Sequence, residues 1–195
     1  MLQDLKFYYQ NKLFPFQIES FQQLSQYFAR RPELLQKQNF INLIDEEDPV
    51  SNISEESIHD FINYFQNQTL PITNSNAVDL HFLSLKYEVP SLTQSTDRYI
   101  SIHYKKIISN FLSDKSNILS KISILYEKLI SSHLIEIIST NREDLLFLPV
   151  TSQYRILSQF SIIYDQIPPP RTQTEREEHE LINQKIKDLV FQIIS

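Results

Sequence analysis

The chain has 195 residues, of which 41% are hydrophobic and 22% charged, and its formal net charge is −6 at pH 7. These values are typical of a globular protein with a buried core; they argue against intrinsic disorder and against nucleic-acid binding, which needs clustered Lys and Arg. The sequence has neither glycine nor cysteine, which excludes disulfides, zinc fingers, thiol nucleophiles, standard phosphate-binding loops and the serine-hydrolase elbow.

The first twenty residues alternate between apolar and polar side chains, a pattern that predicts two strands. The apolar set is Leu5, Phe7 and Tyr9 on the first strand and Phe14, Phe16 and Ile18 on the second. A turn is predicted at Asn11 and Lys12, because asparagine tolerates the positive φ angle that hairpins often give to glycine. The spacing then predicts a helix from Phe21 to just before Pro32, and strand character returns over residues 39–44.

The clearest helix follows Ser54, which is a favourable N-cap residue. Its apolar face has the helical spacing i, i+3, i+4, i+7 and consists of Ile58, Phe61, Ile62 and Phe65. Residues 70–72 are predicted to form a short strand-like segment, in which Pro71 suits only an edge or a strand start. Two further helices flank the Val89-Pro90 step, with Pro90 in the first turn of the second.

The second half is predicted to be almost wholly helical after Tyr99. Apolar stripes with helical spacing cover residues 104–112, 118–129 and 134–138, and another helix is predicted to begin near Pro149. The prolines at 168–170 form a stiff break. The last helix is predicted to begin with Thr174-x-x-Glu177, the spacing of a capping box.

Four blocks of the first half, in the right order, resemble BTB/POZ domains. They are DLKFYYQNKLFPFQIESF, LSQYF, NISEESIHDFINYFQNQTL and NAVDLHFLSLKYEVPSL. The last block is similar to a family pattern that ends in a helix pair, through Asn76, Val78, Leu80, Pro90 and Leu92. The predicted order of strand, strand, helix, strand, helix, short strand and helix pair agrees with this resemblance.

The segment EDLLFLPVTSQYRILSQ resembles the start of the BACK region that follows the BTB domain in many such proteins. The expected fold class is therefore α+β: a BTB/POZ-like fold, a small sheet flanked by helices, over residues 1–100, followed by an all-helical BACK-like region over residues 101–195. This helical region is shorter than a full BACK region. The expected core of the BTB-like fold consists of Phe7, Phe14, Phe28, Ile58, Phe61, Ile62, Leu80, Leu83 and Leu92.

BTB domains are protein-interaction modules, so the resemblance implies a non-enzymatic function in protein–protein binding. One use is as a substrate adaptor that docks the cullin scaffold of a ubiquitin ligase through a hydrophobic-x-acidic motif. The corresponding segment, RRPELLQKQNF, offers Leu34 and Leu35 but no acidic residue at the expected position. The candidate partner-binding residues are Leu34, Leu35, Phe65 and Gln66, although Leu34 and Leu35 also suit an ordinary core.

The other use is as a homo- or hetero-oligomeric scaffold without a ligase role. Many family dimers exchange a segment before the first strand, and since this chain begins at that strand we do not expect a dimer of that type. The apolar stripe of the last helix runs to the C-terminus through Leu189 and Ile193. It could pack on a second copy, on another protein or on the chain's own helical layer.

An enzyme is the rival of a different class, and the sequence offers little for one. The acidic residues Asp45–Asp48 lack the spaced ligands and glycine of an EF-hand loop, so a solvated loop is expected. The five histidines, which show no metal-ligand spacing, are His59, His81, His103, His133 and His179. We expect no metal, cofactor, nucleic acid or membrane partner. Without a signal peptide, membrane span or disulfide, an intracellular location is expected, in the cytoplasm or alternatively the nucleus.

Overall fold

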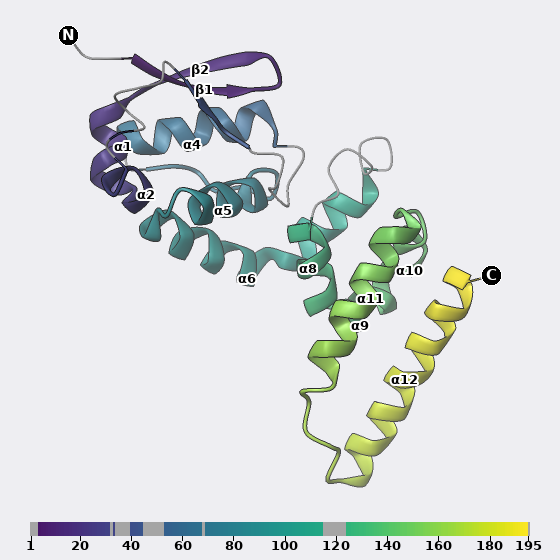
Figure 1. Cartoon of the computed structure of the whole chain (residues 1–195). Coiled ribbons are helices and arrows are strands. Elements are labelled where there is room, and N and C mark those ends of the chain that lie inside the picture. The colour runs from purple at the N-terminus through teal and green to yellow at the C-terminus, as the bar shows by residue number, and fades with distance from the viewer. Residues whose placement is uncertain are drawn as a thin grey trace. The chain divides into compact units, whose positions relative to one another are not determined.

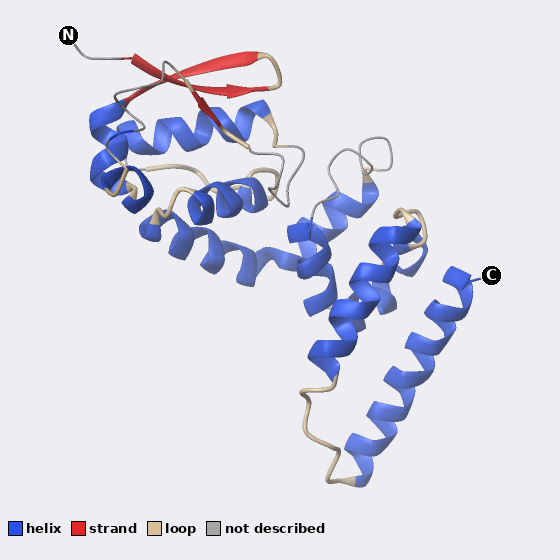
Figure 2. Cartoon of the chain, in the orientation of Figure 1, coloured by secondary structure: helices blue, strands red, loops and turns tan. Residues whose placement is uncertain are grey.

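The computed structural model describes residues 4–31, 33, 40–44, 53–67, 69–114 and 124–194. The chain divides into two compact units, residues 1–107 and 108–195 (Figure 1). The described part of the first unit is a mixed α+β structure with a small sheet, and that of the second unit is helical (Figure 2). The division falls within helix α6 (Pro90–Ser113), which continues past residue 100, where the sequence placed the domain boundary.

Among the described residues, the sheet of the first unit has three strands, β1 (Asp4–Tyr9), β2 (Lys12–Gln17) and β3 (Ile41–Asn42), in the order β2-β1-β3. Strands β1 and β2 form the predicted antiparallel hairpin, with Phe7 opposite Phe14. Strand β3 pairs with β1 in parallel, so a crossover connects the hairpin to the third strand.

The hairpin turn lies one residue earlier than predicted, at Gln10 and Asn11 rather than at Asn11 and Lys12. Both residues have positive φ angles, 47° and 62°, as the tight turns of two-residue hairpins require. The Tyr8 hydroxyl donates to Asn11 Oδ1 at 2.8 Å, which fixes the turn side chain. The chain thus makes without glycine a turn that usually contains it.

The helix predicted from Phe21 to Pro32 is two short helices, α1 (Ile18–Leu24) and α2 (Gln26–Ala29). Ser25 separates them in an extended conformation, and its Oγ accepts from the backbone N–H of Phe28, which caps α2. The same hydroxyl donates to the backbone oxygen of Tyr87, far along the chain. A long-range partner therefore breaks a helix that local spacing predicts to be continuous.

Helices α4 (Glu55–Asn67) and α5 (Ala77–Lys86) complete the first unit together with α6. Ser54 caps α4 as predicted, since its Oγ accepts from the N–H of Ser57 at 3.1 Å. Residues 69–73 belong to no strand, so the short strand expected at 70–72 is wrong. Pro71 and its neighbours instead form a connection held by Asn76, whose Nδ2 donates to the Pro71 oxygen at 3.2 Å.

The core of the first unit is a cluster of aromatic rings between the sheet and the helices. Phe7 of β1 lies at its centre, with ring centroids 4.4 Å from Phe16, 5.5 Å from Phe21 and 5.3 Å from Tyr87. All nine residues expected in the core are at most 5% exposed: Phe7, Phe14, Phe28, Ile58, Phe61, Ile62, Leu80, Leu83 and Leu92.

The second unit contains the end of α6 and the helices α8 (Ile124–Ser132), α9 (Leu134–Thr140), α10 (Arg142–Leu145), α11 (Val150–Tyr164) and α12 (Gln173–Ile194). Helix α11 packs on α8, and α12 contacts α9. Pro149 is the N-cap residue of α11, close to the predicted helix start. The buried apolar residues include Ile130, Leu134, Ile137, Leu145, Ile156, Phe160 and Leu189.

The capping box of α12 lies two residues earlier than predicted. Thr172 Oγ1 accepts from the N–H of Glu175 at 3.2 Å, and the Glu175 carboxylate accepts from the N–H of Thr172 at 3.0 Å. This reciprocal pair has the required spacing. The pair Thr174 and Glu177 has the same spacing but is already inside the helix.

Among the described helices, none is both long enough and apolar enough to cross a bilayer.

Candidate functional site

The partner-binding residues expected from the sequence do not form one described surface. Leu34 and Leu35 lie outside the described residues, as do Asp45–Asp48. Gln66 is exposed, but Phe65 is only 2% exposed and stacks on Phe21 with ring centroids 3.6 Å apart. The Phe65 ring thus belongs to the aromatic core, so its role in partner binding stays a prediction.

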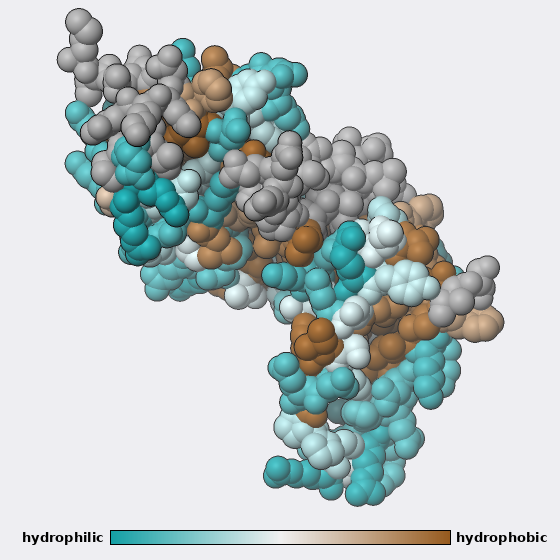
Figure 3. Space-filling model, in the orientation of Figure 1, coloured by the Kyte–Doolittle hydropathy of each residue, from teal (hydrophilic) through white to brown (hydrophobic). Residues whose placement is uncertain are grey.

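Large apolar side chains are exposed on helix α11 of the second unit. Val150, Tyr154 and Ile162 are 56%, 53% and 61% exposed, and their spacing places them along the solvent-facing side of the helix. We call these three residues the α11 row. The space-filling view shows apolar surface over the helices of this unit (Figure 3). Exposed apolar side chains that gather on one element are typical of interaction surfaces.

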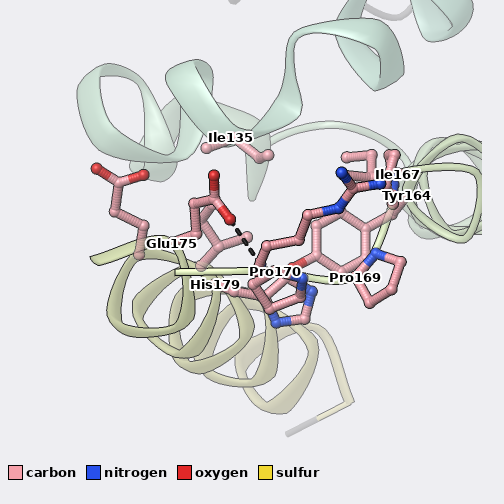
Figure 4. Close-up of a pocket in the computed structure, with 11 residues that line it drawn as sticks. Ile135, Tyr164, Ile167, Pro169, Pro170, Glu175 and His179 are labelled. Atoms are coloured by element: carbon pink, nitrogen blue, oxygen red, sulfur yellow. Dashed lines mark hydrogen bonds between the residues drawn. The ribbon is translucent and has the colours of Figure 1, made fainter. Parts of the chain in front are cut away.

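A pocket of about 480 Å³ lies where the proline segment joins α11 to α12 (Figure 4). Its aliphatic lining comes from Ile135 of α9, from Ile167 in the segment before α12, and from Ile182 of α12. The proline segment 168–170 adds further apolar lining. The volume is within the usual range for ligand pockets, roughly 300–1,000 Å³. The pocket belongs wholly to the second unit.

The N-terminus of α12 forms one side of this pocket. The Glu175 carboxylate accepts hydrogen bonds from the backbone N–H groups of Arg171 and Thr172, at 2.6 Å and 3.0 Å. These two hydrogen bonds hold the pKa of the Glu175 carboxyl below its ordinary value. Two backbone donors at the start of α12, the N–H groups of Thr172 and Glu175, are therefore already used by the chain itself.

Two charged side chains of the pocket have no partner within the described part of the chain. The guanidinium of Arg171 and the carboxylate of Glu178 both line the pocket and are exposed, and neither makes a hydrogen bond or ion pair there. The pocket thus offers one positive and one negative group, in addition to its apolar lining.

Aromatic rings form another wall of the pocket. Tyr164 stacks on Phe160 and on His179, with centroid distances of 5.3 Å and 5.1 Å. His179 is held in turn by Asn183, with 3.0 Å between His179 Nδ1 and Asn183 Nδ2. The Tyr164 hydroxyl is buried and has no hydrogen-bond partner among the described residues, and burial raises its pKa.

In the ranges that the structure describes, no three His, Cys, Asp or Glu side chains are placed to hold a metal ion. Three histidines outside the pocket contact aromatic or hydroxyl side chains. His59 packs edge-on against Phe14, His103 lies beside Tyr99, and His81 is 3.1 Å from Thr96 Oγ1 through its Nδ1.

No local sequence pattern predicts this pocket. The prolines at 168–170 indicate a stiff break, and the adjoining Arg171 carries no recognisable motif. The pocket also needs Ile135, which lies 47 residues before Ile182 and reaches it only through helix packing. The proline run beside charged residues is a composition signal for one wall of the pocket, and it gives no information on the other walls.

Comparison with known proteins adds no family. The chain matches no protein-family model and no curated protein.

Proposed function

We propose that this protein is a non-enzymatic protein–protein interaction module. The α11 row supports this proposal most directly, because it places three large apolar side chains in solvent on one helix. Apolar side chains of this size supply much of the binding energy when a partner covers them. The α11 row is thus the proposed contact surface, and another folded protein is the proposed occupant.

The specific use that we propose is a substrate adaptor of a cullin-type ubiquitin ligase. The resemblance of the first half to BTB/POZ domains supports this use. The order of elements also supports it, with a hairpin followed by helices, a parallel third strand and the pair of helices α5 and α6. Leu34 and Leu35 are the residues proposed to meet the cullin. The resemblance, rather than a contact between described residues and a cullin, is the ground for proposing this use.

The alternative is an oligomeric scaffold without a ligase role. Helix α12 favours this alternative, since Leu181 and Phe191 are 59% and 73% exposed on it. A second copy of the chain would remove such side chains from water.

The deciding experiment is size-exclusion chromatography with light scattering. The purified chain is measured alone over a range of concentrations and then mixed with the N-terminal part of a cullin from the same organism. A stoichiometric complex supports the adaptor, and a dimer of the chain alone supports the scaffold. A monomer that forms no complex at any concentration contradicts both uses.

Variants assign the contact surface. Leu35→Asp is expected to abolish the cullin complex while leaving the helical circular dichroism unchanged. The double variant Val150→Lys, Tyr154→Lys is expected to abolish whichever complex uses the α11 row. Thr151→Lys is the matched control, because Thr151 is an exposed polar residue on the same helix. A complex that forms equally with the double variant and with Thr151→Lys would remove α11 from the interface.

A further inference from the structure

We propose that the pocket between α9, the proline segment and the start of α12 binds an extended peptide of a partner protein. The peptide inserts a bulky apolar side chain, with an acidic residue on one side of it and a basic residue on the other. Arg171 is assigned to the acidic residue and Glu178 to the basic residue. Ile135, Ile167 and Ile182 are assigned to the apolar side chain.

Anionic small molecules fit this pocket poorly. The backbone N–H groups of Arg171 and Thr172, just before α12, already donate to the Glu175 carboxylate. The Glu178 carboxylate adds a second negative charge to the lining. A phosphate or nucleotide that pairs with the Arg171 guanidinium would also meet two carboxylates, those of Glu175 and Glu178.

The charges of Arg171 and Glu178, which have no partner among the described residues, fit a peptide better than a small anion. An apolar ligand alone would remove water from around Arg171 and Glu178 without offering either of them an opposite charge. This cost lowers the binding free energy gained from burying apolar area. A peptide supplies both charges and an apolar side chain from neighbouring positions. The pocket lining is exposed at Pro168, Pro169 and Arg171, so a chain can enter and leave along the surface.

The inference rests on the proposed function, because it makes the second unit part of a protein-binding surface. It differs from the α11 row in its residues: Val150, Tyr154 and Ile162 do not line the pocket. The two surfaces can therefore be tested separately on the same protein. If the chain neither binds a cullin nor dimerises, peptide binding at the pocket is still measurable. If no peptide binds, the tests of cullin binding and of dimerisation are unaffected.

The test uses a phage-displayed library of random dodecapeptides selected on the purified full chain. Enriched peptides are then synthesised with a fluorescent label, and their dissociation constants are measured by fluorescence polarisation. The expected consensus is a bulky apolar residue flanked by one acidic and one basic residue. Arg171→Glu and Glu178→Lys are each expected to weaken binding roughly fivefold, as for the reversal of a partly exposed charge pair.

Charge compensation makes the assignment specific. A peptide whose acidic residue is changed to lysine should bind Arg171→Glu more tightly than it binds the wild-type chain, and a peptide with its basic residue changed to glutamate should do the same with Glu178→Lys. The matched controls are Arg176→Glu and Glu180→Lys, exposed charges on α12 that do not line the pocket. Both controls should stay within about twofold of the wild-type affinity. All four variants should keep the wild-type circular dichroism spectrum, because each substituted side chain is exposed.

Two results would overturn the proposal. One is a selection that enriches no peptide family on the folded chain. The other is an enriched family whose affinity is the same for the wild-type chain, Arg171→Glu and Glu178→Lys, since such peptides would bind elsewhere.

Discussion

The guanidinium of Arg155 holds both carboxylate oxygens of Glu127, with Nε 2.7 Å from Oε2 and Nη2 2.6 Å from Oε1. The Glu127 side chain is 1% exposed, whereas the Arg155 side chain is 51% exposed. The hydrogen bonds to Glu127 raise the pKa of the Arg155 guanidinium. A buried carboxylate on α8 is therefore neutralised by a half-exposed cation on α11, and the pair joins these two helices.

Arg155→Ala is expected to lower the free energy of unfolding by roughly 2–3 kcal/mol. Removing one partner of a fully buried ion pair costs about 3–5 kcal/mol, because the other charge stays buried without compensation. The cost should be smaller here, since the half-exposed position of Arg155 lets water reach Glu127 after truncation. Urea denaturation monitored by circular dichroism measures the change.

The control for this prediction is Arg30→Ala. Arg30 pairs with Glu88 at 3.0 Å, but its side chain is 67% exposed, so its loss should cost at most about 1 kcal/mol. Equal losses for Arg155→Ala and Arg30→Ala would show that the buried carboxylate does not depend on its partner.

Phe61→Ala is expected to destabilise the first unit by about 3–5 kcal/mol, the range for truncation of a buried aromatic residue. Phe61 has no exposed surface, and its ring centroid lies 5.1 Å from Phe65 and 5.7 Å from Tyr87. Chemical denaturation compares it with Phe40→Ala, in which the removed ring is 49% exposed and should cost about 1 kcal/mol or less. A loss within 0.5 kcal/mol for Phe61→Ala would show that this face is not core.

Replacement by phenylalanine should change the free energy of unfolding differently at two tyrosines, Tyr87 and Tyr164. The buried Tyr87 hydroxyl donates to the backbone oxygen of Leu43 at 3.0 Å, so Tyr87→Phe should cost about 1–2 kcal/mol. The buried Tyr164 hydroxyl has no partner within the described ranges, so Tyr164→Phe should leave the free energy of unfolding unchanged within about 0.5 kcal/mol or raise it. Thermal and urea unfolding of both variants provide the comparison. A clear loss of stability for Tyr164→Phe would mean that its hydroxyl has a partner after all.

Elements whose conformation depends on residues close together in the sequence could be predicted from local spacing. The hairpin follows from the alternation around Phe7 and Phe14, and the start of α4 follows from the capping hydroxyl of Ser54. Pro90 lies in the first turn of α6, where its missing N–H costs nothing. In each case the neighbouring residues alone determine the local conformation.

Features that depend on distant residues could not be predicted. The break at Ser25 depends on the Tyr87 backbone oxygen, which no local pattern reveals. Glu88 has a φ of 48° after α5, in a position that glycine usually marks, and this chain has no glycine to mark it. The start of α12 offered two Thr-x-x-Glu patterns of equal spacing, and only the hydrogen bonds of Glu175 distinguish them.

His81 should make the stability of the first unit depend on pH. Burial lowers the pKa of its imidazole below the ordinary value of 6.5, and Asp97, whose Oδ1 lies 3.4 Å from His81 Nδ1, opposes this shift only in part. The unfolded chain therefore binds a proton at this residue more readily than the folded chain does. Its contribution to stability is complete above about pH 6.5 and is lost as the pH falls from there through the lower pKa of the folded state.

Urea denaturation between pH 8 and pH 5 tests this dependence. His81→Gln should lose less free energy of unfolding on acidification than the wild-type chain, because the variant has no group at this position to protonate. Asp97→Asn should lose more, because it removes the negative charge that favours the protonated imidazole. The comparison between the wild-type chain and His81→Gln is decisive, since all other titrating groups are shared. Identical pH profiles for the wild-type chain and His81→Gln would show that burial of His81 does not control its protonation.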